Sequence, residues 1–184
     1  LGDANAERSV TERILPAAVM IKAVARAVQD VPEMNGFFEN GAFVPSDPVH
    51  AGVAISLRGG GLIAPAIHDV ERLSMGELLA ALRDLVGRAR GGRLRASEMS
   101  DPTITVSNLG EQGVESVYAV IYPPQVALVG FGAIVERPWV VDGSVQPRSL
   151  VRVTLAADHR VSDGHVGARF LAAIDRALQE PDVL

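Results

Sequence analysis

The most strongly apolar stretch of the chain runs from Pro16 to Val31. Its polar positions are few, and their spacing places them on one narrow face of a helix; they are Lys22, Arg26, Gln29 and Asp30. We therefore expect nearly all the other positions to be buried. Proline is favoured in the first turn, which predicts a helix that begins near Leu15 and ends at Pro32. A capping box of Ser9 and Glu12 would favour an earlier start.

Two later segments show the period of an amphipathic helix. In the first, Ser74 to Arg90, Ser74 and Glu77 can form a capping box, and Gly91-Gly92 ends the helix. Its apolar stripe consists of Met75, Leu78, Leu79, Leu82, Leu85 and Val86. The second segment runs from about Asp163 to Gln179, and its apolar face consists of Val166, Phe170, Ile174 and Leu178.

The remaining segments read as strands and tight turns. Turn signals on both sides of Phe37-Phe38 predict a short hairpin, and Asp142-Gly143 predicts a second one. The expected strands are His50 to Leu57, Leu62 to Ile67, Thr103 to Val106, Gln125 to Val141, and Val145 to Ala157 with an interruption at Pro147 and Arg148. Helices mixed with hairpin-connected strands favour an α/β sandwich with a mixed sheet over a doubly wound parallel sheet.

Composition narrows the classes of partner. The chain has 184 residues, enough for one domain, and 48% of them are hydrophobic while 21% are charged. We therefore expect a subunit interface. A net charge of −5 argues against nucleic-acid binding, and no apolar run is long enough for a membrane span. The absence of cysteine excludes disulfides, a thiolate nucleophile and cysteine-bound metal.

Two motifs invite a phosphate-binding interpretation that we do not favour. Gly59-Gly60-Gly61 lies between two predicted strands, whereas a phosphate loop leads directly into a helix, so a turn is the better prediction. Arginines cluster after the predicted helix, at Arg83, Arg88, Arg90, Arg93 and Arg95. A solvated face near a helix C-terminus explains them better than a contact to a phosphorylated ligand.

The stretch with most chemistry is the loop from Asp158 to Gly164, between a strand and a helix. His159 can act as a general base near neutral pH. Asp163 stands where an N-cap residue is expected, and the same carboxylate could hold the loop. Ser107, at the end of another strand, is either a turn residue or a donor to an oxyanion. The chain has no Gly-x-Ser-x-Gly elbow, and its histidines lack metal-ligand spacing.

Several segments resemble one family in collinear order. Asp158-His159-Arg160-Val161-Ser162-Asp163-Gly164 matches the Asp-His-Arg-x-x-Asp-Gly signature of dihydrolipoyl acyltransferases, the core components of 2-oxoacid dehydrogenase complexes. Further matching segments are Val31-Pro32-Glu33-Met34-Asn35, Gly61-Leu62-Ile63-Ala64-Pro65, Thr105-Val106-Ser107-Asn108-Leu109-Gly110 and Tyr122-Pro123-Pro124-Gln125-Val126-Ala127-Leu128-Val129-Gly130. The resemblance covers nearly the whole chain.

This resemblance implies a chloramphenicol-acetyltransferase-like two-layer sandwich, a homotrimeric building block or a larger symmetric core, and active sites between subunits. It implies transfer of an acyl group between a dihydrolipoyl thiol and coenzyme A. His159 would be the base, Ser107 the oxyanion-stabilising hydroxyl, and Asp163 the aspartate that supports the loop. Ser107 and Asn108 would contact coenzyme A. The lipoyl group would sit on a separate domain, the partners would be that domain and the other complex components, and no metal is expected.

Alternatives remain open. One is an acetyltransferase acting on a small hydroxyl acceptor, although chloramphenicol acetyltransferases carry a histidine where this chain has Asp158. Another is a non-catalytic structural core subunit, although such a subunit would not need His159, Asp163 and Ser107 together. We expect residues 1–184 to form a catalytic domain that lacks its N-terminal part, in a cytoplasmic protein. The motifs do not separate acetyl, succinyl and branched-chain members, and they do not give the size of the assembly.

Overall fold

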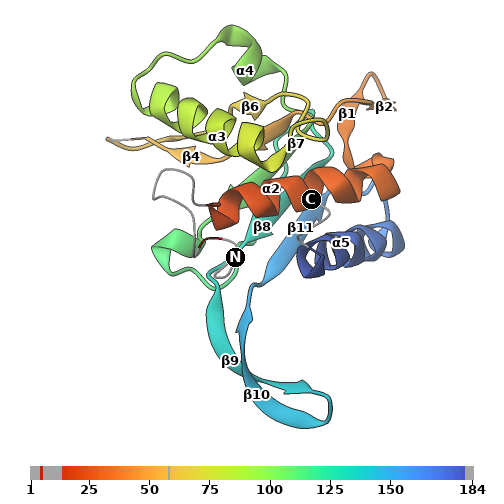
Figure 1. Cartoon of the computed structure of the whole chain (residues 1–184). Helices are drawn as coiled ribbons and strands as arrows, with labels where there is room; N and C mark the ends of the chain where they lie inside the picture. Colours follow the sequence, from red (N-terminus) through yellow and green to blue (C-terminus); the bar gives the residue numbers. More distant parts are fainter. Residues whose placement is uncertain (1–4, 6–13, 58, 181–184) are drawn as a thin grey trace.

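The computed structural model describes residue 5, residues 14–57 and residues 59–180 (Figure 1). Its helices are α2 (Pro16–Asp30), η1 (Pro32–Met34), α3 (Met75–Arg90), α4 (Ala96–Ser100), η2 (Gly110–Gln112) and α5 (Gly164–Gln179). Its strands are β1 (Gly36–Glu39), β2 (Ala42–Pro45), β3 (Ala51–Val53), β4 (Ile55–Ser56), β5 (Leu62–Ile63), β6 (Ala66–Ile67), β7 (Ile104–Asn108), β8 (Ala127–Phe131), β9 (Val135–Val141), β10 (Ser144–Leu150) and β11 (Val153–Ala157). The predicted capping box of Ser9 and Glu12 lies outside the described residues.

The central sheet has the strand order β11-β8-β7-β3-β6 within the described residues. Strand β7 pairs in parallel with both β3 and β8, whereas β6 and β11 are antiparallel to their neighbours. The sheet is therefore mixed, which confirms the prediction from sequence. Figure 1 shows α2, α3 and α5 on the same side of this sheet, so the fold has two layers. Buried side chains of the helices and of β7 and β8 form one hydrophobic core between the layers.

Helix α2 begins after Leu15 and ends at Asp30, as its apolar pattern predicts. The expectation for Lys22 is wrong, because this lysine is only 9% exposed while Arg26, Gln29 and Asp30 are exposed. The Lys22 ammonium donates to the carbonyl oxygens of Val70, Glu71 and Leu73 at 2.5–3.2 Å. Three acceptors satisfy its three protons, which makes burial tolerable, and desolvation lowers the pKa of the amine.

The predicted ends of the other two long helices are confirmed. The hydroxyl of Ser74 accepts a hydrogen bond from the backbone N–H of Glu77, and the Glu77 carboxylate accepts one from the Ser74 N–H. Asp163 is the N-cap of α5. These local contacts satisfy backbone N–H groups that no helix can pair internally, so sequence alone is enough to locate them.

Both predicted hairpins are present, β1–β2 and β9–β10. Each turns on a pair of residues with positive φ, Asn40-Gly41 and Asp142-Gly143, as a type I′ turn requires. The glycines at 59–61 also form a turn, because Leu57 N–H donates to the Gly61 carbonyl at 3.1 Å between β4 and β5. The preference for a turn over a phosphate loop is thus confirmed.

The predicted long strands are divided differently from the expectation. The run from Gln125 to Val141 breaks at 132–134, where the Glu115 carbonyl oxygen comes so close to Gly132 that a Cβ would overlap it. The return run breaks at 151–152 and not at Pro147, which pairs with Pro138 inside the β9–β10 hairpin. The run from His50 to Leu57 divides into β3 and β4, and β7 extends through Ser107 to Asn108.

Within the described residues, no helix is long and apolar enough to cross a membrane. In the arginine cluster, Arg88 binds the buried carboxylate of Glu98 with two contacts of 2.6 Å and also contacts Asp84 at 2.7 Å. This guanidinium lowers the pKa of Glu98 to about 2. Arg88 therefore fastens α4 to α3, and it does not lie on the solvated face that the sequence predicted for the cluster.

Candidate active site

The loop after β11 is held by its first residue, Asp158. The Asp158 side chain is 8% exposed and accepts from the Arg160 guanidinium, with contacts of 2.9 Å from Nε to Oδ1 and 2.6 Å from Nη2 to Oδ2. Its backbone N–H donates to the Val126 carbonyl at 2.8 Å. The arginine keeps the pKa of Asp158 below its usual range. The ion pair of the Asp158 carboxylate and the hydrogen bond of its backbone N–H together fix the residue that precedes His159.

The other end of the loop is fixed by Asp163. Its carboxylate accepts from the N–H groups of His165 and Val166 at 2.9 and 3.0 Å, and these backbone bonds lower its pKa. The structure thus shows Asp163 as a helix cap, which was one of its two compatible interpretations. Arg160, the partner of the other aspartate, lies over the Phe38 ring of β1 with 3.8 Å between guanidinium carbon and ring centroid. Sequence analysis missed this contact.

His159 lies between these two fixed points and is exposed. Its imidazole makes no hydrogen bond with any residue that the structure describes, so the ring is accessible to a substrate. An exposed ring on a loop fastened at both ends is suited to taking a proton from an incoming group.

Ser107 lies on β7, on the side of the sheet away from the helices. Its neighbours Ile104 and Val106 are in the core, and side chains alternate along a strand, so Thr105 and Ser107 point to the opposite face. Ser107 is half-buried. The next residue, Asn108, uses its side-chain oxygen to accept from the Gly110 N–H at 2.8 Å. Asn108 thus closes a turn through that atom.

The pairing of strands separates Ser107 from His159. Ser107 is opposite Gly130 on β8, whereas Ala157, the end of β11, is opposite Ala127 at the start of β8. The two positions are therefore about 10 Å apart along the strands and about 10 Å apart across them. From Ala157 the chain continues away from Ser107, towards Val126. One copy of the chain does not bring the predicted base and the predicted oxyanion donor together.

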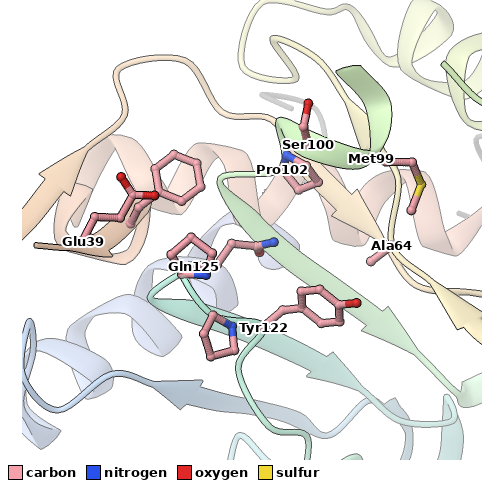
Figure 2. A pocket seen from close by; sticks show the side chains of 10 residues that line it. Glu39, Ala64, Met99, Ser100, Pro102, Tyr122 and Gln125 are labelled. Atoms are coloured by element: carbon pink, nitrogen blue, oxygen red, sulfur yellow. The ribbon is translucent and has the colours of Figure 1, made fainter. Parts of the chain in front are cut away.

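A solvent-open pocket of about 250 Å³ is lined in part by Gln125, whose neighbour Val126 accepts the hydrogen bond from Asp158. Figure 2 shows side chains from β1, α4, the links that precede β6 and β7, and the segment before β8 around it. Its lining residues are Phe37, Glu39, Ala64, Met99, Ser100, Pro102, Tyr122, Pro123, Pro124 and Gln125. Sequence analysis identified Tyr122 to Gln125 only as part of a resemblance.

A second cluster of titratable groups consists of His50, His68 and Asp101. The rings of His50 and His68 are 4.8 Å apart, and His68 Nε2 is 3.0 Å from the Asp101 carboxylate. Burial, together with the nearby His68, lowers the pKa of His50. No group of three or more His, Asp or Glu side chains in the described part of the chain is arranged to hold a metal ion.

The fold and the site define a class of protein. The mixed sheet with helices on one face is similar in fold to chloramphenicol acetyltransferase. That structure matches with a TM-score of 0.51, covering 88% of this chain and 77% of that one, and at 15% identity it shows the fold alone. The sequence matches the 2-oxoacid dehydrogenases acyltransferase (catalytic domain) family over residues 2–184, and the chain belongs to this family.

Individual relatives agree. A dihydrolipoyllysine-residue acetyltransferase component of the pyruvate dehydrogenase complex from Rickettsia bellii is 34% identical over 182 residues, covering 99% of this chain and 42% of that protein. The chain thus spans less than half the length of this relative. The cubic core of a pyruvate dehydrogenase multienzyme complex and the Azotobacter vinelandii dihydrolipoamide acetyltransferase each match with a TM-score of 0.83 and 29% identity, covering all of this chain and 76% of theirs.

Proposed function

We propose that the chain is the catalytic domain of an acyltransferase that moves an acyl group between a dihydrolipoyl thiol and coenzyme A in a 2-oxoacid dehydrogenase complex. The observation that carries the proposal is the exposed His159 on a loop pinned by Asp158 and Asp163, in a chain of this family. Coenzyme A is a substrate in this reaction, and the lipoyl group arrives on a separate domain. Acetyl is the first acyl group to test, because the relatives are named acetyltransferases.

His159 acts as the general base. A free thiol with a pKa of about 8.5 is mostly protonated at neutral pH, so a base beside it raises the thiolate fraction. The thiolate attacks the carbonyl carbon of the thioester, and negative charge collects on the carbonyl oxygen. The tetrahedral species then expels the second thiol as its C–S bond breaks, and the imidazolium returns the proton to the leaving sulfur. The acyl group changes sulfur atoms without any net change in charge.

Ser107 stabilises the oxyanion, as one hydroxyl donor aimed at the developing charge can. A spacing along the chain supports both roles. The Azotobacter vinelandii enzyme was investigated for the role of a serine, a histidine and an asparagine in its catalytic mechanism. Their separations along that chain equal those of Ser107, His159 and Asp163 here. In this chain an aspartate takes the asparagine's place and caps α5.

A second copy of the chain completes the site. Because Ser107 and His159 face different ends of one sheet, the two can meet only across an interface between copies. The β9–β10 hairpin supports such an interface, since it extends away from the body in Figure 1 and exposes Trp139, Val140 and Val145. We propose a homotrimer that builds a larger symmetric core and works with the lipoyl domain and the other components of the complex.

The proposal is tested by acetyl transfer from acetyl-coenzyme A to dihydrolipoamide. We expect His159→Ala to lower turnover by about 10²–10⁴-fold with the assembly preserved, because it removes the base. His165→Ala is the matched control, since His165 is also exposed, lies just beyond the loop and contributes only its backbone N–H to Asp163. Equal turnover in wild type and His159→Ala would refute the general-base role.

A further inference from the structure

The pocket in front of β8 has one deeply buried polar side chain in its wall, Gln125. This residue is only 6% exposed, and its Oε1 accepts a hydrogen bond from the hydroxyl of Thr105 at 2.6 Å. Thr105 is itself 2% exposed. The bond fixes the carbonyl end of the amide against the sheet. The NH₂ end diverges from this bond in the plane of the amide and faces the pocket in Figure 2.

The Gln125 Nε2 has no acceptor among the residues that the structure describes. Among the described residues, Glu33 Oε2 is the only fully enclosed side-chain polar atom that lacks a hydrogen-bond partner. Gln125 Nε2 is therefore not fully enclosed. The amide NH₂ group is thus accessible to solvent, and Gln125 lines the pocket. Protein side chains this deeply buried normally have their hydrogen bonds satisfied, because a lost partner costs about 1–3 kcal/mol. An acceptor that enters the pocket would supply the missing bond.

The backbone around Gln125 is rigid. The Gln125 N–H donates to the Tyr122 carbonyl at 2.9 Å, and the Val126 N–H donates to the Gly36 carbonyl at 3.2 Å. The Val126 carbonyl accepts from Asp158, the residue before His159. The pocket wall and the histidine loop are therefore held in one fixed relation. A donor placed this way can orient a substrate whose reactive end lies at His159.

The other walls of the pocket are mixed, because Glu39 and Ser100 add a carboxylate and a hydroxyl to the apolar side chains. Phe37, Met99, Pro102, Tyr122 and Pro124 surround the amide, and Met99 and Tyr122 are 47% and 62% exposed at the rim. The apolar part of the wall beside the Gln125 amide fits a methylene chain that carries a carbonyl. Both thiol substrates of the proposed reaction have this chemistry, because the lipoyl group ends in an amide and the pantetheine arm of coenzyme A contains amides.

We propose that Gln125 donates a hydrogen bond from Nε2 to an amide carbonyl of a thiol-bearing substrate arm, whose methylene groups lie between Phe37, Pro102 and Tyr122. The inference rests on the proposed function and assigns Gln125 a binding role, while His159 remains the base. The bond forms in the ground state as well as during transfer. Its loss therefore weakens binding of the arm and leaves the chemical step intact.

The test uses Gln125→Met, which keeps the length of the side chain and removes the donor. Because this change also leaves Thr105 without its partner, the double variant Thr105→Val/Gln125→Met is made in parallel; removing both partners of a buried bond is close to neutral for stability. We measure KM and kcat for dihydrolipoamide and for coenzyme A. Both variants should raise the KM of one thiol substrate about fivefold to tenfold, with kcat within about twofold of wild type.

The two substrates identify the source of the amide. A raised KM for dihydrolipoamide alone assigns the pocket to the lipoyl arm, and a raised KM for coenzyme A alone assigns it to the pantetheine arm. Unchanged KM values for both substrates in a variant that assembles normally would overturn the role of Gln125 and leave the proposed function standing.

Calorimetric titration of wild type with dihydrolipoamide and with coenzyme A separates the two proposals further. If wild type binds one of them and Gln125→Met binds it about tenfold more weakly, the inference holds even when no transfer is detected; binding of neither overturns it.

Discussion

The two ends of the central sheet are built differently. At the end that carries His159, the loop is fastened by the Asp158–Arg160 pair, by the bond from Asp158 to Val126 and by the Asp163 cap. At the end that carries Ser107, β8 leads into the β9–β10 hairpin, most of whose side chains are exposed. The His159 loop is held by contacts within the chain. The β9–β10 hairpin, in contrast, presents exposed apolar side chains in the described structure.

This difference indicates that the Ser107 end and the His159 end of the proposed site depend on assembly to different degrees. A two-stranded hairpin is at best marginally stable in water, and this one exposes Trp139, Val140 and Val145 by 56%, 66% and 71%. Large apolar side chains at such exposure mark an interface. We infer that the Ser107 end is stabilised by a second copy, while the His159 end is already in its working arrangement.

The largest expected effect comes from mixing two inactive chains. Ser107→Ala and His159→Ala should each lower turnover by about two orders of magnitude or more, because each removes one half of the site. If the halves come from different copies, coexpression of the two variants restores about a quarter of the sites in a cyclic assembly with random subunit order. Turnover no higher than that of the better single variant would place both residues in one chain.

The hairpin should control assembly. Trp139→Ser removes the largest exposed apolar side chain of β9 and should weaken association by about 2 kcal/mol or more, the range of interface hot spots. Sedimentation velocity gives the oligomeric state, and circular dichroism checks that the monomer stays folded. Val44→Ser on the β1–β2 hairpin is the matched control at the other end, where 44% exposure of a single valine predicts little change. A Trp139→Ser protein that assembles like wild type would contradict the inference.

The His159 end should lose stability when its ion pair is broken. Asp158→Asn removes a buried carboxylate from Arg160 and should cost about 2 kcal/mol of unfolding free energy, which thermal denaturation measures. The folded-state pKa of Asp158 lies below its unfolded value, so this stability is present above about pH 4 and is lost as the pH falls through the folded pKa. Wild type and variant should therefore converge in acid. A difference that is constant with pH would show that the charge is not responsible.

The smallest effect concerns Phe38. Phe38→Leu removes the ring under Arg160, a contact of about 0.5–1 kcal/mol at an exposed site. Turnover should fall severalfold at most through greater freedom of the loop, with KM little changed, and Phe38→Tyr should restore it. Equal kinetics for all three proteins would mean that Asp158 alone positions the arginine.

Local features were predictable because neighbouring residues decide them. The capping box of Ser74 and Glu77, the Asp163 cap and the two type I′ turns each depend on contacts within a few positions. The motif around His159 was equally readable, and the family resemblance that it carries is confirmed. The roles of His159, Ser107 and Asp163 in catalysis stay predictions.

Features that depend on distant segments escaped prediction. Lys22 has the spacing of an exposed residue, yet its three acceptors come from 70–73. The break at Gly132 depends on the approach of Glu115, and His50 and His68 meet through strand pairing between β3 and β6. None of these contacts leaves a local signal, because each partner lies far away along the chain.

The sequence by itself determined the three long helices, the two hairpin turns and the candidate base, since periodicity, caps and a short motif are properties of adjacent residues, and the mix of elements indicated the mixed sheet. Only the tertiary structure decided that Ser107 and His159 lie at different ends of the sheet, that Arg160 packs on Phe38 and that the Gln125 amide opens into a pocket. The physical reason is strand register: it sets which residues become neighbours across the sheet, and the pairing of whole strands, not any single segment, fixes it.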